Sequence, residues 1–193
     1  MPVSKRRAWL ERGLLAGALL VGAGGARADF IVREFQAQIV GEGLLVSTRT
    51  ELGFNAKTEQ ALAKGVPLEV VMHLALVQQR RLLWDLRVAD WELRRRIQFH
   101  ALSGQYLVSG LHPDVYDVES FATLADALGY MGTLKEITLP LTAKKNISAG
   151  ADYAVHLRVH LDIEALPSPL RPVAYTTPAW HLNSGWTSWP IPH

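Results

Sequence analysis

Cysteine is absent from the 193-residue chain. Its absence excludes a disulfide framework, a thiolate nucleophile, a Cys-ligated zinc or iron–sulfur site and a lipoprotein-type cysteine anchor. A large excess of charge of one sign is missing too, since 20 Lys and Arg face 18 Asp and Glu. Hydrophobic residues make up 49% of the chain. This composition argues against disorder and indicates one globular domain, or at most two, that can fold without metals or disulfides.

The first 28 residues have the pattern of an export signal. A positively charged start is followed by an apolar stretch, residues 14–25, and by Ala26-Arg27-Ala28, the small-x-small pattern that a signal peptidase accepts. The apolar stretch is too short to cross about 30 Å of hydrocarbon, so an uncleaved membrane helix is the weaker alternative. We therefore predict cleavage after Ala28, a periplasmic mature chain, and no stable membrane span once the signal is removed.

The signal also carries most of the apparent basicity. It contains five of the Lys and Arg residues and one of the Asp and Glu residues. The mature chain therefore keeps 15 Lys and Arg against 17 Asp and Glu, a formal net charge of −2. A nucleic-acid partner is therefore not expected. Arg6-Arg7-Ala8-Trp9-Leu10 resembles the twin-arginine export consensus, but Lys5, Trp9 and Glu11 depart from it. We favour the general secretory route.

Hydrophobic alternation and turn residues predict mostly strands in the mature chain. Residues 30–40 and 44–50 alternate around a Gly-rich turn and predict a hairpin. Asn55 can cap a helix over residues 56–64, because its side chain can accept a bond from a first-turn amide. Residues 66–77 are apolar at nearly every position, which predicts a central strand covered on both faces.

The second half of the domain continues this pattern. Residues 82–88 and 91–99 alternate with opposite parity, so a bulge near Ala89-Asp90 is predicted, with a break into two strands as the alternative. Helical spacing over residues 121–128, with Asp117 or Ser120 as the cap, predicts a second helix that faces the core. Two further strands are expected over residues 133–141 and 152–164.

From Leu166 onward the composition changes sharply. Six prolines and three tryptophans, Trp180, Trp186 and Trp189, lie in the last 28 residues. Because proline lacks the amide donor of a strand interior, we expect an extended, irregular segment whose aromatic rings dock on the body of the protein. An exposed aromatic strip that recognises a sugar or a partner is the alternative.

These elements define the expected organisation. Residues 1–28 form a cleavable signal peptide, residues 29–165 a single α+β domain, and residues 166–193 a Pro/Trp-rich extension of the same domain. The predicted fold is mainly an antiparallel β-sheet or β-sandwich of about seven strands with two short helices, and the C-terminal segment packs on it.

Three blocks of the sequence resemble a known family. They are residues 99–108 (FHALSGQYLV), 166–172 (LPSPLRP) and 186–190 (WTSWP). In order and spacing they resemble the exported proteobacterial proteins grouped as domain of unknown function 4390, over about Phe30 to Pro192. The family has no assigned activity and no catalytic residues. Its genes often lie beside that of a membrane histidine kinase of nitrogen regulation, so the resemblance implies an association with envelope signalling.

Several histidines and serines are candidates for metal binding or catalysis. His156 and His160 form H-x-x-x-H, but the alternation around them is that of a strand, which separates the two rings by about 13 Å. His73 interrupts an apolar strand as a core or cross-strand histidine would, and His112 lies in a loop segment. No serine lies in a G-x-S-x-G elbow, and the pair His100 and Ser103 are neighbours in a turn. We predict no catalytic residue, no cofactor and no metal ligand.

The best candidates for a partner or ligand surface are therefore aromatic and basic. The run Arg94-Arg95-Arg96 could bind an anion or a lipid headgroup, whereas a charged strand edge that resists aggregation is the simpler interpretation. Asp90 and Glu92 fit the same solvated face. The candidate surface residues are Trp180, Trp186, Trp189, Arg94, Arg95 and Arg96.

The sequence thus favours a non-enzymatic binding or accessory module of the cell envelope, with an unknown protein or envelope component as its partner. One alternative is a carrier of an apolar ligand, held between the sheet and the helix over residues 121–128. The other is a hydrolase whose site cannot be recognised from one sequence.

Overall fold

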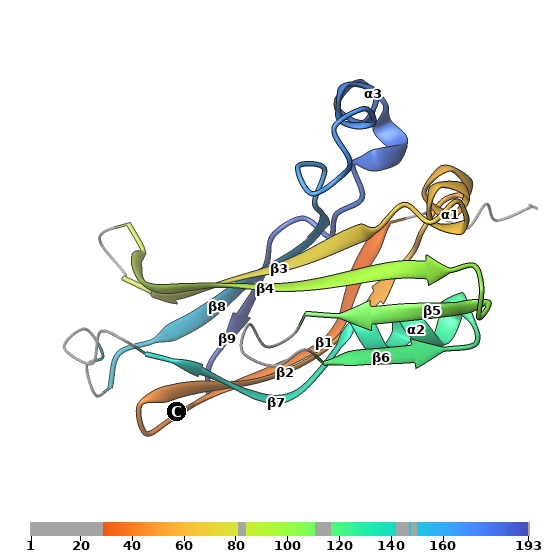
Figure 1. The fold of residues 1–193 in the computed structure, drawn as a ribbon. Coiled ribbons are helices and arrows are strands. Elements are labelled where there is room, and N and C mark those ends of the chain that lie inside the picture. Colours follow the sequence, from red (N-terminus) through yellow and green to blue (C-terminus); the bar gives the residue numbers. More distant parts are fainter. Residues whose placement is uncertain (1–28, 81–83, 111–116, 142–146, 148–149, 193) are drawn as a thin grey trace, which may run out of the picture.

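The computed structural model describes residues 29–80, 84–110, 117–141, 147 and 150–192. Within this part of the chain two antiparallel sheets form a sandwich, accompanied by short helices (Figure 1). This is the α+β, mainly antiparallel fold that the sequence predicts. The predicted cleavage site at Ala28, and also His112, lie outside the described residues.

The smaller sheet has the strand order β1-β2-β7. Strand β1 (Phe30–Val40) and strand β2 (Gly43–Leu52) form the predicted hairpin, and strand β7 (Thr133–Pro140) pairs with the other side of β2. Gly41 occupies the turn with a φ of 58°, a left-handed conformation that glycine adopts without strain. A two-residue turn, Gly41 and Glu42, therefore connects the two strands of the hairpin.

The larger sheet has six strands in the order β6-β5-β4-β3-β8-β9. Its strands are β3 (Leu68–Gln78), β4 (Leu86–His100), β5 (Gln105–Ser109), β6 (Val118–Phe121), β8 (Tyr153–Leu161) and β9 (Thr187–Pro190). Strand β3 lies between β4 and β8, which explains why its sequence is apolar on both faces. The prediction of a central strand is confirmed.

The change of parity along β4 is a bulge. Leu76 pairs with Ala89, and the next residue, Val77, pairs with Arg87, so Val88 is the extra residue. The bulge lies within two residues of the predicted position. It keeps β4 continuous, and its inward-facing side chains fill the space between the two sheets.

Two helices flank the sheets. Helix α1 (Ala56–Ala63) is capped by Asn55, as predicted. Helix α2 (Leu124–Met131) is capped by Thr123, so the predicted caps Asp117 and Ser120 are wrong. The reason is that the preceding residues, Val118–Phe121, pair with β5 as strand β6 instead of starting the helix. Helix α2 contacts strands of both sheets and closes one end of the sandwich.

The C-terminal segment packs on the body and is more regular than expected. It contains helix α3 (Arg171–Thr176), a 3₁₀ turn (Pro178–Trp180) and strand β9 at the edge of the larger sheet. Prolines in the first helical turn need no amide donor, and Pro190 is tolerated in an edge strand, so the proline content does not prevent these elements. The described residues form nine strands, more than the seven expected.

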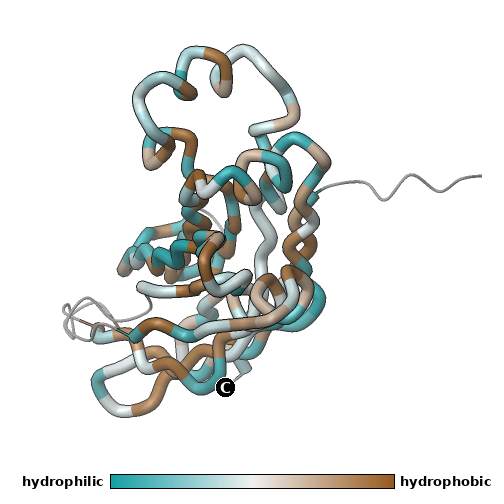
Figure 2. Tube along the Cα trace, turned by 45° about the vertical axis from the view of Figure 1, so that its right-hand side comes forward, coloured by the Kyte–Doolittle hydropathy of each residue, from teal (hydrophilic) through white to brown (hydrophobic). Residues whose placement is uncertain are grey.

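Side chains from both sheets form one hydrophobic core, and hydrophobic and hydrophilic residues alternate along the strands (Figure 2). Leu44 and Val46 enter it from the smaller sheet, and Leu74 and Leu157 enter it from the larger one. None of the helices in the described residues is long and apolar enough to cross a membrane.

Candidate binding groove along the edge of β1

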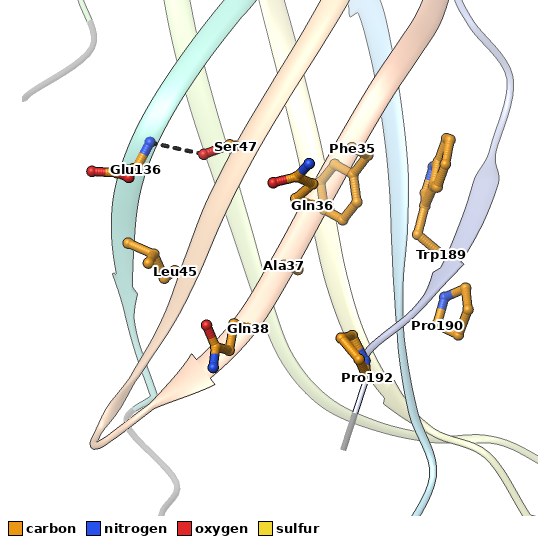
Figure 3. A pocket seen from close by; sticks show the side chains of 10 residues that line it. All are labelled: Phe35, Gln36, Ala37, Gln38, Leu45, Ser47, Glu136, Trp189, Pro190 and Pro192. Atoms are coloured by element: carbon orange, nitrogen blue, oxygen red, sulfur yellow. Dashed lines mark hydrogen bonds between the residues drawn. The ribbon is translucent and has the colours of Figure 1, made fainter.

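A groove of about 600 Å³ runs between β1 and β9, the strands nearest the two ends of the described chain (Figure 3). Its volume lies within the range of about 300–1,000 Å³ that is typical of ligand pockets. Its lining residues come from four strands and the last residues: Phe35, Gln36, Ala37, Gln38, Leu45, Ser47, Glu136, Trp189, Pro190 and Pro192.

The groove follows the open edge of β1. Four consecutive residues, 35–38, line it although alternate residues point to opposite faces of the sheet. Among the described strands, β1 pairs with β2 alone. The side chains of both faces therefore meet the groove because it runs along the strand's backbone edge.

The register decides which backbone groups face the groove. Val40 and Gly43 pair directly across the two-residue turn, and hydrogen-bonded pairs then alternate along the hairpin. The amide of Leu141 donates to Glu42 at 2.9 Å, which shows that the neighbouring positions of β2 bond away from β1. The N–H and C=O groups of Ala37 and Ile39 consequently point to the open edge.

The opposite wall is apolar. Trp189 pairs with Val155 on β8, and its half-buried ring lies 5.9 Å from the ring of Phe35, measured between centroids. The indole N–H donates to the Thr187 hydroxyl at 3.2 Å, which fixes the ring orientation. Together with the exposed Pro190, this ring gives the groove a stiff hydrophobic side.

The floor toward β7 is polar. Ser47 stands opposite a bulge of β7, where Glu136 has a φ of 50°. The Glu136 amide donates to the Ser47 hydroxyl at 3.0 Å, the bond drawn in Figure 3, and the Glu136 carboxylate stays exposed. With the side chains of Gln36 and Gln38, the groove offers amides and a carboxylate opposite an aromatic wall.

The four edge strands of the described sheets differ in how they resist pairing with other chains. Strand β6 has only four residues, β9 has four and contains Pro190, and β7 contains Pro140, two charges and a bulge. Such features are the usual protection of a sheet edge. The first part of β1 has a bulge near Arg33, but residues 35–40 (FQAQIV) contain no charge and no proline. This half of β1 is the unprotected edge.

The three candidate tryptophans of the C-terminal segment lie in three different environments. Trp180 is 4% exposed in the core. Trp186 is 49% exposed on the outer side of the larger sheet, in an edge-to-face contact with His73 whose ring centroids lie 5.2 Å apart. Trp189 lines the groove. The structure does not bring them together into one aromatic strip.

Strand alternation divides the Arg94–Arg96 run between the two faces of β4. Arg94 donates to Glu69, Asp162 and Glu92 at 3.0, 2.6 and 3.0 Å, and Arg96 contacts Glu69 at 3.2 Å. The hydrogen bonds to Asp162 and Glu69 raise the pKa of Arg94 above its ordinary value. These two guanidinium groups are held in a network with carboxylates of the outer face.

Arg95 points to the interior. Its guanidinium donates to the carbonyl oxygens of Tyr130 and Thr133, at the end of α2, and lies 4.8 Å from the centre of the Tyr130 ring. Burial lowers the pKa of this guanidinium, whereas Tyr130 and Asp117 raise it. Arg95 therefore anchors α2 to the larger sheet.

The histidines considered as metal ligands or catalytic groups do not line the groove. His156 and His160 lie on the outer face of β8, in a strand as predicted. No group of three or more His, Asp or Glu side chains in the described residues is arranged to hold a metal ion. His100 and Ser103 are 2.9 Å apart, Nδ1 to Oγ, in an exposed turn.

The sequence did not reveal the groove itself. The uncharged alternation of residues 35–40 was its available signal, together with the clustered Trp189 and Pro190. What the sequence could not indicate is that β1 and β9, at opposite ends of the domain, lie side by side.

Comparison with known proteins identifies the family of this chain. Neither the curated proteins nor the solved structures contain a significant match to this chain. The family described as a domain of unknown function, DUF4390, matches residues 27–190, which include the nine described strands and every lining residue of the groove except Pro192. The chain belongs to the DUF4390 family.

Proposed function

We propose that this protein is an exported, non-enzymatic binding module of the cell envelope that captures an extended segment of a partner protein along β1. The observation that carries the proposal is the unprotected edge over residues 35–40, of which residues 35–38 line a preformed groove. A peptide that adds a strand to such an edge gains main-chain hydrogen bonds, and its alternate side chains enter neighbouring pockets.

The groove also indicates the kind of segment. A strand added beside Ala37 places alternate side chains toward Trp189 and Phe35, where apolar or aromatic residues pack best. The side chains between them face Gln36, Gln38 and Ser47, which favour polar partners. The expected ligand is therefore a short extended segment with alternating apolar and polar residues.

A single segment fits this edge better than a second copy of the chain. Two β1 strands pairing edge to edge would bring the Trp189 and Pro190 wall of each copy against the other copy. A lone strand on the β1 edge brings no second wall and avoids that conflict. The unprotected edge is thus suited to a partner segment and shielded by its own wall from sheet-to-sheet association.

Export is supported by the succession of charged, apolar and small residues before Asp29. The association with envelope signalling rests on the family resemblance alone. Mass spectrometry of the protein from intact cells tests export directly. We expect a mature chain that begins at Asp29, and a chain that still begins near Met1 would contradict the proposal.

Peptide selection tests the groove. Displayed random peptides are selected on the native chain and their affinities are measured by titration. Substituting Ala37→Pro removes an N–H that faces the groove but none that bonds β2, so the hairpin should persist while peptide binding falls at least tenfold. The matched variant Ala37→Ser keeps this N–H at a side chain of similar size and should bind within about threefold of the native chain.

Two further readouts decide the mode of binding. On peptide addition, the amides of Ala37 and Ile39 should become protected from hydrogen exchange. Equal peptide affinity for the native chain and Ala37→Pro would overturn the strand-addition proposal. A native dimer that Ala37→Pro dissociates, measured by sedimentation, would also overturn it, because the edge would then be occupied by a second copy.

A further inference from the structure

The outer face of the larger sheet, remote from the β1 edge, contains one arginine without a carboxylate partner. Each carboxylate on this face is within 4 Å of another arginine: Glu69 with Arg94 and Arg96, Glu92 and Asp162 with Arg94, and Asp90 with Arg87. Arg158, half-buried on β8, forms no ion pair with the described residues. Its guanidinium keeps five N–H donors for a ligand.

The next outward residue along β8 is His160, whose half-buried ring also lacks a partner. Its Nδ1 atom is buried and forms no hydrogen bond to the described part of the chain. Burial lowers the pKa of His160 most, and Arg158 lowers it further. Asp162 and Glu92 act in the opposite direction, and His73 on β3 adds a smaller lowering effect. The lowered pKa favours the neutral form of the ring, which is the outward neighbour on β8 of a guanidinium without an ion pair in the described residues.

A small cleft of about 220 Å³ opens next to these two side chains. His181 and Asn183, from the C-terminal segment, form its other wall together with Glu164. The Asn183 side chain is occupied, since it donates to the His181 carbonyl at 3.1 Å and accepts from the Gly185 amide at 3.0 Å.

The carboxylate of the cleft, Glu164, also bonds to another residue and not to Arg158. Glu164 accepts the hydroxyl of Tyr175 and forms no ion pair with Arg158. The exposed His181 ring forms no hydrogen bond to the described residues. The guanidinium donors of Arg158 and the buried Nδ1 of His160 are therefore left without a partner in the described residues, and a ligand oxygen would supply an acceptor for the guanidinium.

We propose that this cleft binds an oxyanion, a phosphate or carboxylate group of a ligand, between Arg158 and the rings of His160 and His181. The planar guanidinium matches both groups through two parallel hydrogen bonds. The cleft shares no lining residue with the β1 groove, so anion binding and peptide capture can be tested separately.

Titration with two simple anions tests the site. Sodium phosphate and sodium acetate are added separately to the native chain at constant ionic strength, with chloride as the reference, and the imidazole signals of His160 and His181 are followed by NMR. We expect saturable shifts with at least one anion and a raised pKa of His160 in the bound state, because a nearby negative charge favours the protonated ring. The stronger anion identifies the group.

Matched arginine variants separate a site from general charge effects. Arg158→Gln should weaken anion binding at least tenfold, and Arg158→Lys, which keeps the charge but loses the planar fork, should bind with intermediate strength. Arg87→Gln changes the charge of the same face by the same amount and should bind within about twofold of the native chain. No saturable shift with either anion, or equal losses in Arg158→Gln and Arg87→Gln, would overturn the proposal.

Discussion

Gly132 shows how a single residue can set the distance between two elements. It follows α2, where its amide donates to the Leu128 carbonyl at 2.9 Å and its carbonyl accepts the Thr50 amide at 2.8 Å. A Cβ atom at this position would lie 1.9 Å from the Thr50 carbonyl oxygen. Since its φ of −79° is open to any residue, glycine is required here for space and not for conformation.

We therefore predict that Gly132→Ala destabilises the protein by about 2–4 kcal/mol, because α2 must move away from β2 to relieve the overlap. Urea unfolding followed by circular dichroism gives the free energy of unfolding. Gly129→Ala is the control, since nothing lies within 4 Å of its added Cβ and it sits inside α2. Alanine there should stabilise the helix by about 0.5–1 kcal/mol. Equal stability of both variants would contradict the close approach.

At the scale of elements, local signals and long-range pairings account for what the sequence could and could not predict. The β1–β2 hairpin and α1 depend on turn and capping residues within a few positions, so both were predictable. Strand β6 is four residues long and owes its structure to pairing with β5, which no local pattern encodes. The groove needs β1 beside β9, and this adjacency follows from the whole fold.

Asn55 makes both local and long-range hydrogen bonds. Its Oδ1 accepts the amides of Lys57 and Thr58 at 3.0 and 3.1 Å, which caps α1. Its Nδ2 donates to the Ala179 carbonyl at 2.6 Å, which joins α1 to the C-terminal segment. One side chain thus holds two elements far apart in sequence.

We expect Asn55→Ala to lower the free energy of unfolding by about 1–2 kcal/mol, because the cap and the tertiary bond are lost together. Thermal melting and urea titration measure the change. Lys57→Ala, an exposed change in the same turn, should stay within about 0.5 kcal/mol of the native chain. Indistinguishable Asn55→Ala and Lys57→Ala variants would mean that the cap contributes little.

At the scale of the whole molecule, the C-terminal segment completes the core. Leu166, Trp180, Leu182 and Ile191 are all buried, and β9 covers the edge of β8. Burial of one such side chain contributes about 1.5–3 kcal/mol, against a total stability of about 5–15 kcal/mol for a typical domain. Several of these contributions together decide whether the domain is folded.

Deleting the chain after Arg171 should therefore lower the melting temperature by many degrees or leave the protein insoluble, because the core opens and β8 becomes an exposed edge. Deleting only the residues after Ile191 should leave the melting temperature nearly unchanged, since Pro192 is exposed. Differential scanning calorimetry compares the three chains. A cooperative transition at the original temperature after the longer deletion would assign the segment to a binding surface.

The central position of β3 also determines when the protein can fold. Val70 pairs with Leu161, about 90 residues later, so β3 acquires its second neighbour only when nearly the whole chain is present. Until then the strand LEVVMHLALVQ exposes an apolar edge that is prone to aggregate. Pairings this distant in sequence are typical of domains that fold in milliseconds to seconds. A nascent chain would therefore benefit from a chaperone that covers this strand until β8 has been synthesised.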